Sequence, residues 1–347
     1  MTLPATQSAV LLLALLATLC WGLWASTLKA AGRWRFEIYA VDFAAGALLC
    51  TLVAGLTVGT YGSDITFFDN LLIVYKRQLA YALVGGAIYA LGNMLLMAAI
   101  SLAGLSLMFA AAAGPSLAVG LICAIWLWPA GAGSLLPVSI GAGFCASLAS
   151  ALAHRLRIRT FRQEYKDPKT LEAKRRIIKR RGSWKPLTMA ALGGVMMGAF
   201  FPLAEMARLL HIEMGPYPIA FCLGVGMLSS TIFCALFFIN LPLDGEYLGL
   251  TSCLRGPWKN RLLGIAGGLI WGTGALAALL AIGAPPELRR PPYSSYAIAQ
   301  ASGVVALLSG VLFWKELAES SRLVKALAAI SALLLALAVW LAGLPVS

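Results

Sequence analysis

Residues 106–127 read SLMFAAAAGPSLAVGLICAIWL, a run of apolar and small residues that contains no charged side chain. A helix needs about 20 predominantly apolar residues to cross the hydrocarbon core of a bilayer, and this run meets that length. The sequence contains nine further predominantly apolar runs of about this length, at residues 8–28, 38–56, 79–99, 135–152, 187–209, 218–240, 262–283, 296–313 and 323–344. We therefore predict an all-α, polytopic membrane protein with ten transmembrane helices.

The composition of the chain agrees with this fold class. Hydrophobic residues make up 60% of the 347 residues, charged residues make up 12%, and the mean hydropathy is +0.84. A soluble domain carries about 25% charged residues, because its surface faces water. A surface this poor in charge must face lipid, so we expect a lipid bilayer around the protein and exclude a soluble enzyme.

One basic stretch divides the ten runs into two groups of five. The formal net charge is +13, and basic residues are concentrated in residues 154–185, which argues against a nucleic-acid-binding surface spread over the fold. We expect a first five-helix half at residues 1–153, a basic linker at 154–185 and a second five-helix half at 186–347. An odd number of spans per half gives the halves opposite orientations, as in the inverted repeats of secondary transporters.

The charge of the linker predicts its side of the membrane. Lysine and arginine are enriched in cytoplasmic loops, so the linker is expected in the cytoplasm and the amino terminus outside. The chain is then an integral, multi-pass protein of the cell membrane, inner or plasma. A nucleotide-binding linker is the alternative, but no G-x-x-x-x-G-K-[ST] motif occurs in it. We interpret the linker as a surface segment attracted to anionic head groups.

Two acidic residues inside the predicted spans are candidates for proton coupling. Polar groups inside a membrane are costly and mark substrate or proton pathways. Asp42 lies just inside the second span, and the alternative for it is a carboxylate favoured at a helix N-terminus. Glu205 follows Pro202, which leaves a helical carbonyl free to bind a ligand. Arg208 lies one turn after Glu205, so a structural ion pair is the alternative there.

Five further residues are candidates for a substrate cavity. The amide of Asn93, in the middle of the third span, suits a substrate with ureido or imide groups, and an interhelical hydrogen bond is the alternative. Tyr296 and Gln300 are four residues apart and share one helix face, while membrane-boundary anchoring is the alternative for the tyrosine. Trp24 and Trp271 lie well within their spans, so we expect them in the cavity.

The sequence contains no recognisable catalytic or metal-binding constellation. The two histidines, His154 and His211, both fall in predicted loops, and the seven cysteines show no C-x-x-C spacing. We therefore predict that the protein is not an enzyme and that it carries no cofactor and no metal site. The predicted partners are a small-molecule substrate, protons and lipid.

Other residues predict how the helices pack. Gly86 and Gly268 lie in glycine-rich parts of their spans and predict close helix contacts. Pro115, in the middle of the fourth span, predicts a break or kink. Lys315 and Glu316 end the ninth span beside a short turn, so we expect them to cap and orient the last hairpin.

Short motifs along nearly the whole chain point to one family. The first half contains WGLW at residues 21–24 and LGN at 91–93, and the second half contains FPLA at 201–204 and GLIWG at 268–272. The most distinctive motif is GVLFWKE at residues 310–316. In their order and spacing these motifs resemble the ureide permease family of the drug/metabolite transporter superfamily.

The resemblance implies ten spans, a central cytosolic loop and proton-coupled uptake of ureides or oxo nitrogen heterocycles such as allantoin or uracil. It also implies that Asp42 and Asn93 correspond to the family's acid and asparagine. Residues 273–281 are nearly all apolar, whereas the family carries asparagine and glutamine there. A sugar transporter or a drug or metabolite exporter of the same superfamily is therefore an alternative. A further alternative, from another functional class, is a membrane-embedded enzyme or assembly subunit that acts on lipid.

Overall fold

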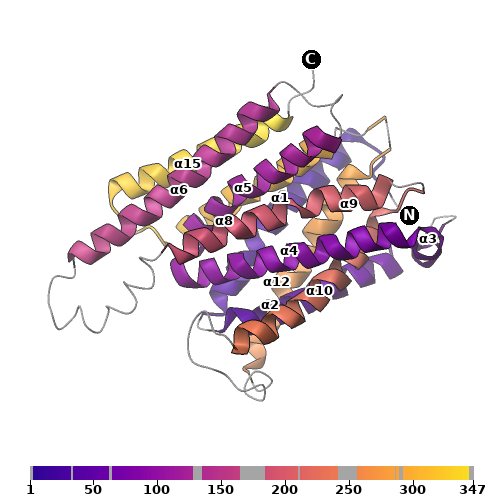
Figure 1. The fold of residues 1–347 in the computed structure, drawn as a ribbon, viewed down its shortest axis with the longest axis horizontal. Coiled ribbons are helices and arrows are strands. Elements are labelled where there is room, and N and C mark those ends of the chain that lie inside the picture. The colour runs from indigo at the N-terminus through magenta and orange to yellow at the C-terminus, as the bar shows by residue number, and fades with distance from the viewer. Residues whose placement is uncertain are drawn as a thin grey trace.

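The chain folds into a bundle of long helices (Figure 1). The computed structural model describes residues 3–32, 34–61, 65–127, 135–164, 184–209, 212–240, 256–285, 287–288 and 292–343. These residues contain no strand, and they include ten helical segments that are long and apolar enough to cross a membrane. The predicted fold class, an all-α polytopic membrane protein with ten spans, is confirmed.

The ten predicted spans correspond to single helices or to pairs of consecutive helices. The first five are α1 (Gln7–Ala30), α2 (Phe36–Leu56), α4 (Lys76–Ala103), α5 (Leu105–Leu127) and α6 (Leu136–Glu164). The last five are α8 (Lys185–Gly198) with α9 (Phe200–Leu209), α10 (Pro216–Asn240), α12 (Trp258–Ile282), α13 (Pro292–Gln300) with α14 (Ser302–Leu312), and α15 (Arg322–Gly343).

The sixth and ninth spans are each divided into two helices. The sixth is interrupted between α8 and α9, and the ninth between α13 and α14. Pro202 explains the first interruption, because it has no N–H to donate to the carbonyl of Gly198 and its ring crowds that carbonyl. A Ser/Gly pair, Ser302 and Gly303, accompanies the second interruption, and such pairs are a common cause of helix kinks.

Three local features differ from the sequence-based expectations. Helix α5 continues through Pro115, so the fourth span is not broken there, while the kink expected as the other possibility stays a prediction. Helix α6 continues to residue 164, because leucine and arginine are good helix formers; His154 is therefore a buried helical residue and not a loop residue. A short helix, α3 (Phe67–Ile73), is too short to be predicted as a span and starts with a capping box of Thr66 and Asp69. Residues 165–183 of the linker and His211 lie outside the described residues.

Each helix of the first half corresponds to the helix five spans later in the second half. A pair of helices that packs together has a counterpart pair, made of the two corresponding helices, that also packs together. Helix α2 packs along α12 as α10 packs along α4, and α1 packs along α12 as α8 and α9 pack along α4. The pairs that are their own counterparts, α2 with α10, α5 with α14 and α6 with α15, join the halves. Helices α6 and α15 form one edge of the bundle (Figure 1). This correspondence is what two equivalent five-helix halves require.

Glycines at two helix crossings show the same correspondence. Gly86 and Gly226 lie at the crossing of α4 with α10, and Gly268 and Gly46 lie at the crossing of α12 with α2. A Cβ atom at any of the four would lie 2.0 to 2.3 Å from a backbone carbonyl oxygen of the partner helix. The close contacts predicted at Gly86 and Gly268 are therefore confirmed. The four carbonyls belong, in the order above, to Leu223, Leu83, Phe43 and Ile265.

Candidate functional site

A small cavity lies between the helices of the two halves, and we refer to it as the aromatic cavity. Its volume is about 20 Å³, which is room for about one water molecule. Aromatic rings, one of them a phenol, dominate its walls, together with one amide and two serine residues. The residues that line it are Trp21, Trp24, Tyr89, Phe109, Ala113, Ser116, Met197, Phe200, Gln300 and Ser302.

Both divided spans are interrupted at the aromatic cavity. Met197 and Phe200 line it from the two sides of the interruption in the sixth span, and Gln300 and Ser302 do so in the ninth span. Pro202 has no N–H to donate to the carbonyl of Gly198, so this carbonyl lacks its helical partner and is available to a ligand at the first interruption. Secondary transporters typically bind substrate at such discontinuous helices near the middle of the bilayer. We therefore take this cavity as the candidate substrate site.

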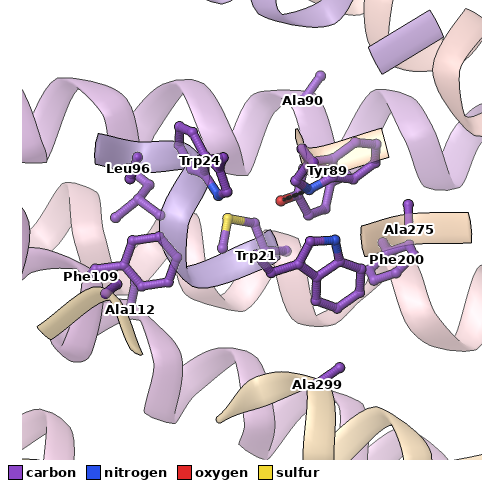
Figure 2. Close-up of a cluster of buried hydrophobic side chains, with 14 of the residues drawn as sticks. Trp21, Trp24, Tyr89, Ala90, Leu96, Phe109, Ala112, Phe200, Ala275 and Ala299 are labelled. Carbon is purple, nitrogen blue, oxygen red and sulfur yellow. Dashed lines mark hydrogen bonds between the residues drawn. The ribbon is translucent and has the colours of Figure 1, made fainter. Parts of the chain in front are cut away.

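The rings of the cavity come from different helices and pack against one another (Figure 2). Trp21 of α1 meets Phe200 of α9 edge to face, with ring centroids 5.8 Å apart, and Tyr89 of α4 meets the same phenylalanine at 5.5 Å. Trp24 and Phe109 lie with their centroids 6.1 Å apart. Such contacts fix the angles of the rings, so a flat solute that enters an opened cavity meets preformed stacking faces.

Polar groups in the walls of the cavity are few. Nε1 of Trp21 is buried and has no hydrogen-bond partner among the described residues, but it lies against α12, where a Cβ atom at Gly274 would be 3.0 Å from it. The amide of Gln300 can both donate and accept hydrogen bonds at the cavity.

Three of the predicted cavity residues lie at the cavity or directly behind it. Trp24 and Gln300 line the cavity. Trp271 of α12 stands behind its wall, where its indole N–H donates to Oη of Tyr89 over 2.6 Å and its ring stacks on that of Trp21 with a centroid distance of 6.5 Å. The predicted tryptophans and glutamine are therefore brought together.

The other two predicted cavity residues have different positions. The hydroxyl of Tyr296 donates to the backbone carbonyl of Ser116 over 2.7 Å, and its ring stacks on Phe201 at 4.4 Å, so this tyrosine joins α13 to α5 and α9 beside the cavity. Asn93 is buried one turn after Tyr89 on α4 but does not line the cavity. Its Oδ1 has no partner among the described residues.

Asp42 lies near the start of α2, at the end of the bundle where α6 ends and α8 begins, which we call the linker end. Its Oδ1 accepts a hydrogen bond from Nη1 of Arg261 on α12 over 3.2 Å. Its Oδ2 is buried without a partner in the described part of the chain. The next residue, Phe43, contacts Trp24 and Trp271 with centroids 4.9 and 6.2 Å apart. Asp42 is therefore close to the cavity but does not line it.

Glu205 lies on α9, on the other side of the cavity from the linker end. Arg208 donates to both carboxylate oxygens, from Nε to Oε1 over 3.1 Å and from Nη2 to Oε2 over 2.8 Å. Arg208 also donates to Glu213 over 2.8 Å. The structural ion pair considered as the alternative for Glu205 is thus present. The two acids predicted for proton coupling lie on opposite sides of the cavity and do not form one site.

A second polar cluster surrounds Glu316 at the linker end. Its carboxylate pairs with Lys29 and accepts hydrogen bonds from the backbone N–H groups of Leu105 over 2.9 Å and Ser106 over 2.8 Å, at the start of α5. Arg157 of α6 donates to the backbone carbonyl of Glu316 over 2.6 Å. Burial by itself raises the pKa of Glu316, but the hydrogen bonds, first that from Lys29, outweigh it and lower this pKa. The Glu316 carboxylate thus caps the start of α5 and joins the turn before α15 to α1 and α5, and the capping of the last hairpin itself stays a prediction.

Several residues that line the cavity were not predicted from the sequence. Tyr89, Phe109 and Phe200 are aromatic residues inside apolar runs, and the sequence does not show whether such a ring faces lipid or a cavity. Two signals point toward part of the answer. Trp21 lies three residues before Trp24 and therefore on the same face of α1. Phe200 lies two residues before the proline of the sixth span.

Comparisons with known proteins support the fold without giving a family. No protein-family model matches the sequence, and no curated protein matches it. A solved structure, described only as the crystal structure of a protein, matches over 97% of this chain and 97% of its own, with a TM-score of 0.53 and 16% sequence identity. This likeness concerns the fold alone and extends along nearly the whole chain. The chain is therefore an integral, multi-pass membrane protein with a fold that is similar to that of a solved protein.

Proposed function

We propose that this protein is a secondary transporter that moves small polar solutes through the aromatic cavity. A bundle of ten apolar helices fits a membrane transporter in general. One observation carries the proposal. The sixth span (α8 and α9) and the ninth span (α13 and α14) are both divided, and both are interrupted at the same cavity. Discontinuous helices that meet near the midplane are the usual substrate site of secondary transporters.

The favoured solutes are ureides and oxo nitrogen heterocycles, such as allantoin and uracil, taken up with protons. The resemblance to ureide permeases supports this class. So does the chemistry of the cavity, because Trp21, Trp24 and Phe200 offer stacking faces for a flat ring. The amide of Gln300 matches the alternating donors and acceptors of an imide or ureido group.

Transport requires the aromatic cavity to open, because about 20 Å³ holds no solute larger than water. Asp42 and Arg261 join α2 to α12 at the linker end. Protonation of Asp42 removes the charge that holds Arg261, so it loosens this crossing and favours opening on that side. Glu205, Arg208 and Glu213 form the ionic cluster on the other side of the cavity. The two ionic clusters then loosen in turn, as the cavity opens first to one side of the membrane and then to the other.

Export of hydrophobic drugs or metabolites is the second candidate. The apolar walls of the cavity and the apolar residues 273–281 of α12 favour it, since an apolar solute needs few polar partners. A monosaccharide is less well matched, because its several hydroxyl groups require more hydrogen-bonding side chains than this cavity contains.

The test is uptake into proteoliposomes of labelled allantoin, uracil and several monosaccharides, with and without an imposed pH gradient. We expect gradient-dependent accumulation of a heterocycle and no accumulation of the sugars. Entry of none of these solutes under either condition contradicts the proposed substrate class. In that case a deletion strain that becomes sensitive to hydrophobic drugs identifies the exporter activity.

A further inference from the structure

An apolar groove lies between α14 and α15 on the outer surface of the bundle. Its volume is about 560 Å³, within the range of about 300–1,000 Å³ that is typical of ligand pockets. Leu307 and Val311 of α14 form one wall, and the small side chains of Ala328, Ala329 and Ala332 of α15 form the other. The groove exists because three alanines face the larger residues across a wide separation.

The corresponding position in the first half is closed. Helix α5 packs tightly along α6, where a Cβ atom at Gly114 would lie 2.1 Å from the carbonyl oxygen of Gly143. Helix α15 is instead held to α6, since Ser331 bonds to Ser150 over 2.8 Å and to the carbonyl of Ala146 over 2.8 Å. Because α15 follows α6, it diverges from α14 and leaves the groove open to the lipid.

Two lysines line the groove where it reaches the linker end. Lys325 donates to the carbonyl of Ala318 over 2.8 Å, which leaves two of its three ammonium hydrogens for another partner. Lys315 has a φ of +49°, at a helix C-terminus where glycine is usual. The next residue closes the helix end, because the N–H of Glu316 donates to the carbonyl of Gly310 over 3.0 Å. A lysine held in a left-handed conformation indicates a constraint other than local stability.

The charge around the two lysines is net positive. Arg322 is exposed at the start of α15, and Glu319 is the exposed acid of the same turn. The other acid, Glu316, is already paired with Lys29. An anion at this end of the groove is therefore attracted, while the rest of the groove is apolar.

We infer that the groove binds one anionic phospholipid of the leaflet at the linker end. One acyl chain lies against the alanines of α15, and the phosphate contacts Lys315 and Lys325. Apolar walls below a pair of cations match the two parts of such a lipid, and basic clusters next to membrane helices attract anionic head groups. A second copy of this chain fits less well, because a symmetric contact places the lysines of both copies at the same depth, where they repel.

Native mass spectrometry of the purified protein tests this inference, with phosphatidylglycerol and phosphatidylcholine of identical acyl chains as probes. We expect preferential binding of phosphatidylglycerol. The double variant Lys315→Ala/Lys325→Ala should lose that preference, with a roughly tenfold or greater drop in phosphatidylglycerol binding. The double variant Lys185→Ala/Lys259→Ala removes two exposed lysines away from the groove and should retain it.

The acyl-chain part of the inference has its own pair of variants. Ala329→Phe fills the groove and should lower the binding of both lipids, whereas Ala326→Phe, at an exposed alanine outside the groove, should not. Melting temperatures establish that the variants remain folded. Equal binding of the two lipids by the unmodified protein, or unchanged binding in both groove variants, overturns the inference. A dimer that only Ala329→Phe dissociates, with lipid binding unchanged, assigns the groove to a second copy.

Discussion

Asp42 has one carboxylate oxygen bound to Arg261 and the other buried without a partner among the described residues. We expect Asp42→Asn to abolish proton-driven accumulation and to leave substrate exchange intact, because asparagine preserves the side-chain shape but cannot carry the proton. Counterflow and gradient-driven uptake in the same proteoliposomes separate the two activities. Normal accumulation by this variant rules out Asp42 as the coupling site, and Glu205→Gln is then the next variant to measure.

Glu316 should make the stability of the protein depend on pH in the acidic range. Its folded pKa lies below the ordinary value, so the stabilisation is complete above an unfolded pKa of about 4.3 and is lost as the pH falls through the folded value. At neutral pH, Glu316→Gln should lower the free energy of unfolding by about 1–3 kcal/mol, since Lys29 and the start of α5 lose a charged partner.

Apparent melting temperatures from about pH 7 to about pH 3 measure this effect. The difference between the unmodified protein and Glu316→Gln should shrink toward the acidic end. Glu319→Gln, at an exposed acid of the same loop, is the matched control. A difference that stays constant with pH would show that the carboxylate charge of Glu316 contributes nothing to stability.

At the scale of the elements, the crossings of α4 with α10 and of α2 with α12 should respond alike to substitution. Gly86→Ala and Gly268→Ala each place a methyl group against a backbone carbonyl, which cannot move as a flexible side chain does. We expect each to destabilise the protein by about 1–3 kcal/mol. Gly141→Ala, on α6, meets nothing within 4 Å and should be neutral or stabilising by up to about 1 kcal/mol.

Thermal unfolding of the three alanine variants in one detergent makes this comparison. Equal losses at Gly86 and Gly268 support the equivalence of the two crossings and hence of the two halves. If one of these variants is as stable as Gly141→Ala, that crossing is looser than the structure indicates, and the correspondence between the halves fails there.

For the whole molecule, the ten spans were predictable because bilayer thickness sets a minimum length for each apolar run. Run length and hydropathy are properties of the linear sequence. The continuation of α6 past residue 152 was not predictable in the same way, because its arginines lower the hydropathy while they maintain the helix. The interruption of the ninth span was also missed, since no proline marks it.

The cavity was only partly predictable, for a related reason. Trp24 and Gln300 stand out as a large aromatic and an amide inside apolar runs, and both line the cavity. The direction in which an ordinary aromatic residue points depends on how its helix packs, so Tyr89 and Phe109 carried no distinguishing signal. Asn93 stood out equally well but does not line the cavity. A buried amide is costly wherever it is placed, so its presence in a span does not show whether it faces the cavity or another helix.

We propose that solute crosses the membrane through the aromatic cavity, and an uptake experiment tests this path. It compares gradient-driven uptake of labelled uracil and allantoin by the unmodified protein and by Gln300→Leu, at equal amounts in proteoliposomes. We expect accumulation by the unmodified protein and an uptake about tenfold lower in Gln300→Leu, because leucine has a similar side-chain volume but removes the hydrogen bonds to the solute. Accumulation at the same rate by both proteins would contradict a transport path through this cavity.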